Sequence, residues 1–230
     1  MAKTASLGRR MLAEALGTLI LLFVGTGAII STAFVHSASG SQLLVVALAH
    51  GIALAIAITA ALAISGGHIN PAVTISMLVA RRIKAWDALG YIIAQVAGAA
   101  LAILLLMLML PHQLGAATGW GLPTLASSAT IIQGTLIEAM ITFFLVFSVF
   151  MTAADPKIGS KIGGLGVGLT LTVLILFAGP FTGAAANPSV YMGPAIATGN
   201  FTNWYVYWIG PVLGGIAAAL ICKYGLLKKG

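Results

Sequence analysis

Six long apolar segments constrain this 230-residue chain more than any other feature of its sequence. They lie at residues 11–33, 43–65, 86–110, 130–152, 162–180 and 204–224. Each is long enough, at about 1.5 Å per residue in a helix, to cross a hydrocarbon layer about 30 Å thick. Only 7% of the residues are charged, too few to cover a core of this size with a polar surface. The sequence therefore predicts an all-α membrane protein with six transmembrane helices.

The basic residues predict how these spans are oriented. They fall at the chain ends and in the loops after the second and fourth spans, in four clusters: Lys3, Arg9 and Arg10; Arg81, Arg82 and Lys84; Lys157 and Lys161; Lys223, Lys228 and Lys229. The opposite loops, at about 34–42, 111–129 and 181–203, contain no Lys or Arg. Because loops rich in these residues stay in the cytoplasm, we expect a multi-pass protein of the plasma or inner membrane with both termini cytoplasmic. Topology accounts for the net positive charge, so we expect no nucleic-acid partner.

The second half of the chain repeats the first at a spacing of about 115 residues. Near the start of a span, Glu14-Ala-Leu-Gly-Thr18 is echoed by Glu138-Ala-Met-Ile-Thr142. The run S-G-G-H-I-N-P-A at 65–72 is echoed by T-G-A-A-A-N-P-S at 182–189. We expect one channel domain over residues 1–230, with repeat one at about 8–110 and repeat two at about 130–226. Since each repeat has an odd number of spans, the two have opposite orientations, as in many transport proteins.

Two Asn-Pro pairs predict a short helix in each repeat. They are Asn70-Pro71 and Asn187-Pro188. Asn is a strong N-cap and Pro fits the first helical position. The apolar stretches that follow, 72–80 and 189–197, cross only half a bilayer, at about 13 Å each. They start from opposite sides of the membrane, so we expect two re-entrant half-helices that meet near its midplane, where non-helical backbone is tolerated beside a water-filled passage.

Half-helices that meet in this way favour a pore for neutral molecules. Their N-termini place the positive ends of two helix dipoles, about half an elementary charge each, at the midplane. Cations and hydronium are disfavoured there, whereas the side-chain amides of Asn70 and Asn187 can donate to a small uncharged molecule. We therefore expect passive conduction of water and small neutral solutes, with protons and ions excluded.

Over essentially its whole length, the chain resembles the major intrinsic protein family, the aquaporins and their glycerol-conducting relatives. The two Asn-Pro segments and the Glu-x-x-x-Thr pair carry this resemblance. It implies six helices and two half-helices, one pore per subunit, a homotetramer in membrane lipid, and no cofactor or bound metal. It also assigns to the pore four residues at the contact between the half-helices: Pro71, Ala72, Pro188 and Ser189, the last in place of the usual Ala. The sequence contains no plausible catalytic constellation, so we expect no enzyme.

The resemblance assigns four further residues to an outer constriction of the pore. They are His50, Ile175, Ala184 and Val190. Most family members have Arg at the position of Val190, and this set is similar to that of certain plant tonoplast intrinsic proteins, which conduct water together with urea and related solutes. Without the guanidinium, the constriction is expected to be wider and less polar. Urea, glycerol, ammonia and hydrogen peroxide are the candidate solutes.

Two histidines differ in the role that the sequence suggests. His50 would be the one polar side chain in an apolar ring, and its titration near pH ~6.5 could control flux. His68 precedes Asn70, and we expect it to pack in the loop with some contact to the pore.

Other functions stay open at this point. A dedicated glycerol or metalloid-hydroxide facilitator would share the fold, although Tyr207-Trp208 and Tyr191 are more similar to water-conducting members. A membrane scaffold would need no pore. A proton-coupled secondary transporter could use Glu14 and Glu138, the only acids expected to be buried in the spans. Alternatively, each of these carboxylates accepts hydrogen bonds from a neighbouring non-helical loop, and their symmetric placement favours this structural role.

Overall fold

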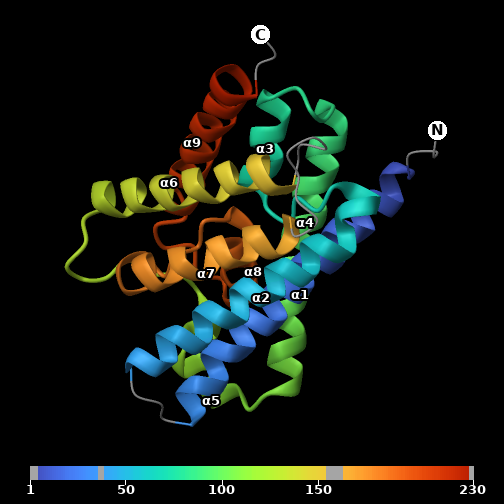
Figure 1. Cartoon of the computed structure of the whole chain (residues 1–230). Helices are drawn as coiled ribbons and strands as arrows, with labels where there is room; N and C mark the ends of the chain where they lie inside the picture. The colour runs from blue at the N-terminus through green and yellow to red at the C-terminus, as the bar shows by residue number, and fades with distance from the viewer. Residues whose placement is uncertain (1–4, 36–38, 154–162, 228–230) are drawn as a thin grey trace.

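The computed structural model describes residues 5–35, 39–153 and 163–227, and these residues are almost entirely helical (Figure 1). The α-helices are α1 (Leu7–Phe34), α2 (Ser39–Ser65), α3 (Pro71–Val79), α4 (Ala85–Met109), α5 (His112–Ala117), α6 (Ile131–Ser148), α7 (Gly163–Thr182), α8 (Pro188–Thr198) and α9 (Val206–Ile221). The described residues also form a short 3₁₀ helix, η1 (Gly119–Gly121), and two π-helical turns, η2 (Val149–Ala153) and η3 (Cys222–Leu226).

Six of the described helices are long and apolar enough to cross a membrane, which confirms the predicted number of spans. The helices begin and end within a few residues of the expected bounds. The largest differences are at the starts of α1 and α2, which begin at Leu7 and Ser39, and at the end of α6, which gives way to η2 after Ser148. A helix can continue past the hydrocarbon layer into water, so apolar length marks the buried part of a span and not its ends. The loop expected at 111–129 contains α5 and η1, which hydropathy does not reveal.

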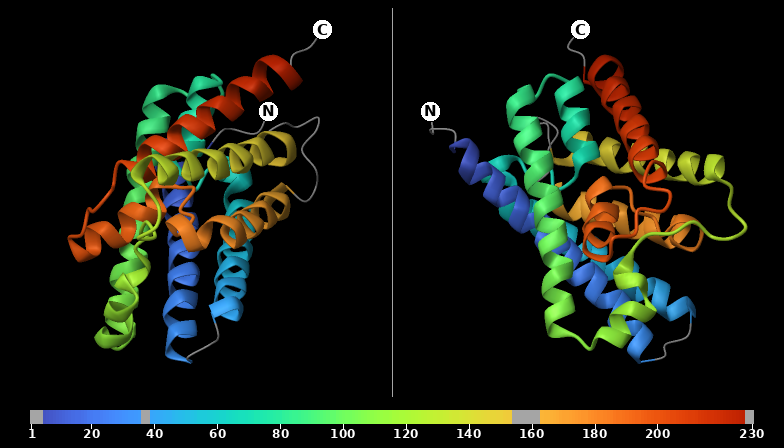
Figure 2. Two further views of the ribbon diagram at one scale, coloured as in Figure 1. Left: turned by 90° about the vertical axis from the view of Figure 1, so that its left-hand side faces the viewer. Right: turned by 180° about the vertical axis from the view of Figure 1, so that it is seen from behind.

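The helix order long, long, short, long occurs twice, as an inverted repeat predicts. Helix α1 lies between α2 and α4, and α6 packs in the same way against α7 and α9 (Figure 2). The two repeats meet where α2 packs along α7. Each half-helix also packs against the last span of the other repeat, α3 against α9 and α8 against α4. The half-helices therefore interlock the two repeats.

The distribution of side chains is that of a protein in lipid. Large apolar side chains face outward along α4, including Trp86, Leu89, Ile93, Leu101 and Leu108. The interior holds polar groups such as Glu14, Gln95 and Glu138, all fully buried. This inversion of the soluble pattern explains how a chain with so few charges folds without a polar surface.

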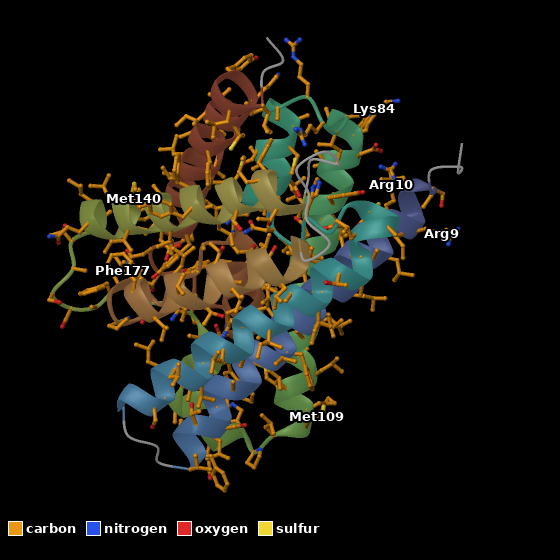
Figure 3. All side chains as sticks on the ribbon, viewed as in Figure 1. Arg9, Arg10, Lys84, Met109, Met140 and Phe177 are labelled. Atoms are coloured by element: carbon orange, nitrogen blue, oxygen red, sulfur yellow. The ribbon has the colours of Figure 1, made fainter. Side chains whose placement is uncertain are left out.

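The described basic residues gather at one end of the molecule. Arg9, Arg10 and Lys84 lie at the end that carries both termini, and Met109 lies at the other (Figure 3). Arg10 Nη1 pairs with Asp87 at 3.0 Å, joining the starts of α1 and α4. The predicted cluster members Lys3, Lys157, Lys161, Lys228 and Lys229 lie outside the described residues.

Two glycines at equivalent positions of the repeats allow the closest helix crossings. A Cβ at Gly98 of α4 would overlap the backbone oxygen of Ala15 in α1. A Cβ at Gly214 of α9 would likewise overlap the backbone oxygen of Ala139 in α6. Backbone atoms cannot yield as a flexible side chain can, so these positions require glycine.

We expect Gly98→Val and Gly214→Val each to lower the free energy of unfolding by about 1–3 kcal/mol or more, because overpacking forces the helices apart. Unfolding in mixed micelles titrated with sodium dodecyl sulfate measures this. Gly8→Val is the control, since a Cβ at Gly8 meets nothing within 4 Å. Equal stability of the three variants would contradict the packing argument.

Candidate functional site: a path between two half-helices

Each half-helix is capped by its own asparagine. Asn70 precedes α3 with extended backbone (φ −158°, ψ 122°), and its Oδ1 accepts from the Ala72 N–H at 2.8 Å. Asn187 precedes α8 with almost the same geometry (φ −160°, ψ 114°), and its Oδ1 accepts from the Ser189 N–H at 2.9 Å. A proline occupies the first turn of both helices. The N-caps thus form for the local reason that the sequence suggests.

The same asparagines connect the two repeats. Asn70 Nδ2 donates to the carbonyl of Ala186 at 2.8 Å, and Asn187 Nδ2 donates to the carbonyl of Ile69 at 3.0 Å. Both asparagines are almost completely buried. An amide nitrogen has two hydrogens, and the described protein groups take one from each. The second hydrogen on each side is available to a molecule between the helix tips.

The backbone before each asparagine takes a left-handed turn. Ile69 has φ 55°, and Ala184 and Ala186 have φ 49° and 47°. Non-glycine residues rarely adopt this region, and a β-branched residue such as Ile69 does so only when its surroundings hold it there. The turn aims consecutive N–H groups in one direction, where they need a buried acceptor.

Glu14 is that acceptor in the first repeat. Its Oε1 accepts from the Ser65 hydroxyl at 2.6 Å and the His68 N–H at 2.9 Å. Its Oε2 accepts from the Ile69 N–H at 2.6 Å and Gln95 Nε2 at 2.8 Å. The carboxylate therefore accepts from four donors: two N–H groups of the half-loop, as we call residues 66–69 and the equivalent residues 183–186, one hydroxyl at the end of α2, and one amide of α4.

Glu138 holds the second half-loop in the same way. Its Oε1 accepts from the Thr182 hydroxyl at 2.7 Å and the Ala185 N–H at 3.0 Å, and its Oε2 accepts from the Ala186 N–H at 2.8 Å. Pro211 stands where the first repeat has a glutamine, so that donor has no counterpart. Because the loops occupy both carboxylates, the geometry supports a structural role for these acids.

Two adjoining cavities run along the half-loops. The middle cavity, which offers about 20 Å³ to the centre of a water-sized molecule, is lined by His68, Asn70 and Asn187 among apolar side chains. The outer cavity, which offers about 40 Å³ on the same measure, is lined by all four residues assigned to the constriction: His50, Ile175, Ala184 and Val190. Val190 also lines the middle cavity, as do Leu171 and Ala185 of the outer one, so the two cavities adjoin at these three residues.

The remaining site residues expected from the sequence lie beside this path. Pro71, Ala72, Pro188 and Ser189, which the resemblance assigned to the pore, are buried where the half-helices begin and line neither cavity. Their position is that of packing residues between the helix tips. His68 both lines the middle cavity and packs in the half-loop. Its Nδ1 lies 3.1 Å from Thr74 Oγ1, and its ring packs edge-on against Tyr91.

The orientation of His50 determines what it offers to the path. Its Nδ1 lies 2.9 Å from the carbonyl oxygen of Val46. A carbonyl only accepts, so Nδ1 carries the hydrogen and the neutral ring presents Nε2 as an acceptor. The ring fits because its neighbour in α1 is Gly25, where any Cβ would overlap the imidazole.

Apart from Ile175, Ala184 and Val190, sequence reasoning missed the apolar lining of the path. Several lining residues form pairs at equivalent positions of the two repeats: Leu21 with Leu145, Leu54 with Leu171, Ile58 with Ile175, and Val73 with Val190. The repeat alignment itself could have found them, because residues related by the pseudo-symmetry face the same central path. Gly121 and Pro123, which also line the outer cavity, have no such signal.

Six membrane-capable helices around a buried path of neutral side chains define the class of protein, a membrane channel. The chain belongs to the major intrinsic protein family, because the sequence model described as Major intrinsic protein matches residues 1–222. Members of this family are channels and not enzymes, so the chain is an integral, multi-pass channel for passive passage of water and small solutes.

Comparison with individual proteins agrees with the family. The chain is 40% identical to "Probable aquaporin TIP3-2" of Arabidopsis thaliana over 96% of its own length and 85% of that protein. It is also 40% identical to "Aquaporin TIP2-1" of the same plant, over 96% and 88%. The structure of the aquaglyceroporin from Plasmodium falciparum superimposes with a TM-score of 0.86 at 23% identity, covering 96% of this chain and 98% of that one. This last likeness confirms the fold.

We expect Glu14→Gln and Glu138→Gln to lower the free energy of unfolding by about 1–3 kcal/mol for each charge-assisted hydrogen bond lost, with the larger effect at Glu14. A glutamine would turn one acceptor oxygen into an NH₂ group facing N–H donors. Micellar unfolding provides the measurement, and Asp87→Asn is the control, because a partly exposed pair contributes about 0–1 kcal/mol. Losses no larger than that of the control would contradict the role assigned to these acids.

Ser189→Ala tests the one departure at the half-helix contact. The Ser189 hydroxyl is buried and has no hydrogen-bond partner among the described residues. Removing it should leave stability unchanged or raise it by up to about 1 kcal/mol, with unchanged water permeability. Thr182→Val is the matched comparison and should lower stability, since the Thr182 hydroxyl donates to Glu138. A destabilised Ser189→Ala protein would show that the hydroxyl has a partner in the membrane.

Proposed function

We propose that this protein is a passive channel for water and for small neutral solutes, with urea, glycerol, ammonia and hydrogen peroxide as the candidates, and that it excludes protons and ions. The outer cavity carries the proposal. Among the described residues that line either cavity, none is charged. A solute in the outer cavity therefore meets apolar walls, one imidazole and the polar backbone of the second half-loop.

The outer filter in this proposal consists of His50, Ile175, Ala184 and Val190. Val190 is buried beside Ile175 and supplies no donor, and Ala184 leaves room next to its own backbone. The acceptor Nε2 of His50 suits molecules that carry N–H or O–H groups, which urea, ammonia and water all do. A wide, weakly polar opening discriminates little between these solutes, because pore diameter and lining groups set selectivity.

Proton and ion exclusion would arise at the half-helix tips. The N-termini of α3 and α8 both face the middle cavity, so two positive dipole ends raise the energy of any cation there. A water molecule that accepts from the amides of Asn70 and Asn187 has both lone pairs engaged. It cannot accept a proton from the next water in the file, which interrupts proton transfer while water itself passes.

A proton-coupled transporter and a dedicated glycerol facilitator fit less well. The carboxylates of Glu14 and Glu138 are occupied by the half-loops, so neither faces a path along which a proton could move. Tyr191 and Tyr207, at positions where glycerol channels differ, are buried and stacked with their ring centroids 4.6 Å apart. These rings pack α8 against α9 and support the broader water channel.

The assembly and location belong to the same proposal. We place residues 1–230 in one channel domain with repeats at about 8–110 and 130–226, which the equivalent packing of α1 with α4 and of α6 with α9 supports. Both termini would face the cytoplasm, and four copies would form a homotetramer with one pore each. The expected plasma or inner membrane competes with a vacuolar membrane, which the likeness to plant TIP-type aquaporins favours.

Val190→Arg tests the permeant range. A guanidinium in the outer cavity should lower urea and glycerol permeability by about tenfold while water permeability stays within about twofold. Stopped-flow light scattering on proteoliposomes measures all three fluxes, and Val190→Leu controls for a larger side chain without charge. The unmodified protein should show fast, non-saturating flux without proton leakage. Urea and glycerol fluxes that Val190→Arg leaves unchanged would remove the proposed filter.

A further inference from the structure

The loop between α4 and α6 contains a strained turn at the end of the molecule away from both termini (Figure 1). Three consecutive residues of η1 have left-handed backbone: Gly119 (φ 56°), Trp120 (φ 53°) and Gly121 (φ 75°). Glycine adopts this region freely, but a bulky side chain there is an outlier. Such a conformation persists only where contacts with the surrounding protein hold it in place.

Trp120 is anchored inside the protein although it belongs to a surface loop. Its side chain is only 3% exposed and joins the apolar core. The indole lies directly on Gly115 of α5, where a Cβ would overlap the ring, and the His112 ring packs against it with centroids 6.0 Å apart. The turn also packs against α1 and α8. The tryptophan therefore fixes the backbone on either side of it.

The residues that follow Trp120 form part of the pore wall. Gly121 lies against Thr26 of α1, and Pro123 lies against Gly183, whose backbone leads into the second half-loop. Both line the outer cavity together with the four filter residues. Further along, the Ala126 N–H donates to the carbonyl of Phe181 at 2.9 Å, which ties the loop to the end of α7.

We propose that Trp120 is a positioning residue for permeation: it holds Gly121 and Pro123 as an additional wall of the outer constriction and thereby sets the width available to neutral solutes. This inference rests on the proposed function. Neither Gly121 nor Pro123 has a long side chain that could swing aside, so the opening on this side depends on where the backbone lies. A solute larger than water responds to such a shift more strongly than water does.

The test compares variants that release the turn with variants that do not. Trp120→Ala removes the anchor, and Gly115→Ala displaces the indole without altering it. Both should raise the ratio of glycerol to water permeability by about threefold or more. Trp120→Phe, which keeps an aromatic anchor, should stay near the unmodified ratio. The matched controls are Trp86→Ala, at a tryptophan that is 78% exposed on α4, and Gly8→Ala, where a Cβ meets open space.

Stopped-flow measurements on proteoliposomes of equal protein content give the ratio, and micellar unfolding reports whether each variant is folded. A ratio in Trp120→Ala equal to that of Trp86→Ala overturns the inference, as does an equal loss of both permeabilities. If Trp120→Ala fails to fold, the ratio of glycerol to water permeability in Gly115→Ala is compared with that in Gly8→Ala, and equal ratios overturn the inference. A failure of the proposed function would be distinguishable. It would appear as slow or saturating flux in the unmodified protein, or as urea and glycerol fluxes that Val190→Arg leaves unchanged.

Discussion

Backbone polar groups at the centre of a bilayer have no water to bond with, and this constraint organises the whole molecule. A pore that opens between two half-helices needs non-helical backbone at that depth. Glu14 and Glu138 make it possible, because each gathers consecutive N–H groups of one half-loop around a buried carboxylate. The opposite edge of the loop, with its carbonyls, is then left for the neighbouring asparagine and the path.

The two repeats are joined most tightly where the path is. Asn70 and Asn187 each cap their own half-helix and donate to the half-loop of the other repeat. Each half-helix also packs on the last span of the opposite repeat. The narrow part of the channel is thus built from the same contacts that hold the two repeats together.

Repetition explains why so much of the path could be predicted. The Asn-Pro segments and the two acids were recognisable because each occurs once in each repeat. In the structure, each acid accepts hydrogen bonds from the loop that precedes one Asn-Pro pair. The apolar pairs such as Leu54 with Leu171 were missed although the same alignment relates them. A single leucine in a span looks alike whether it faces lipid, a neighbouring helix or a pore. Gly121 and Pro123 belong to the long loop that joins the repeats, and no internal copy points to them.

The sequence alone determined the number of spans, their inverted duplication and the short helices at each Asn-Pro, because hydropathy, an odd number of spans and local N-capping are properties of segments. Tertiary structure decided which side chains line the path, which donors surround each carboxylate, and how the α4–α6 loop enters the outer cavity. These features depend on how helices rotate and cross, and backbone contacts such as that of Gly98 with Ala15 set those angles only when the chain is packed.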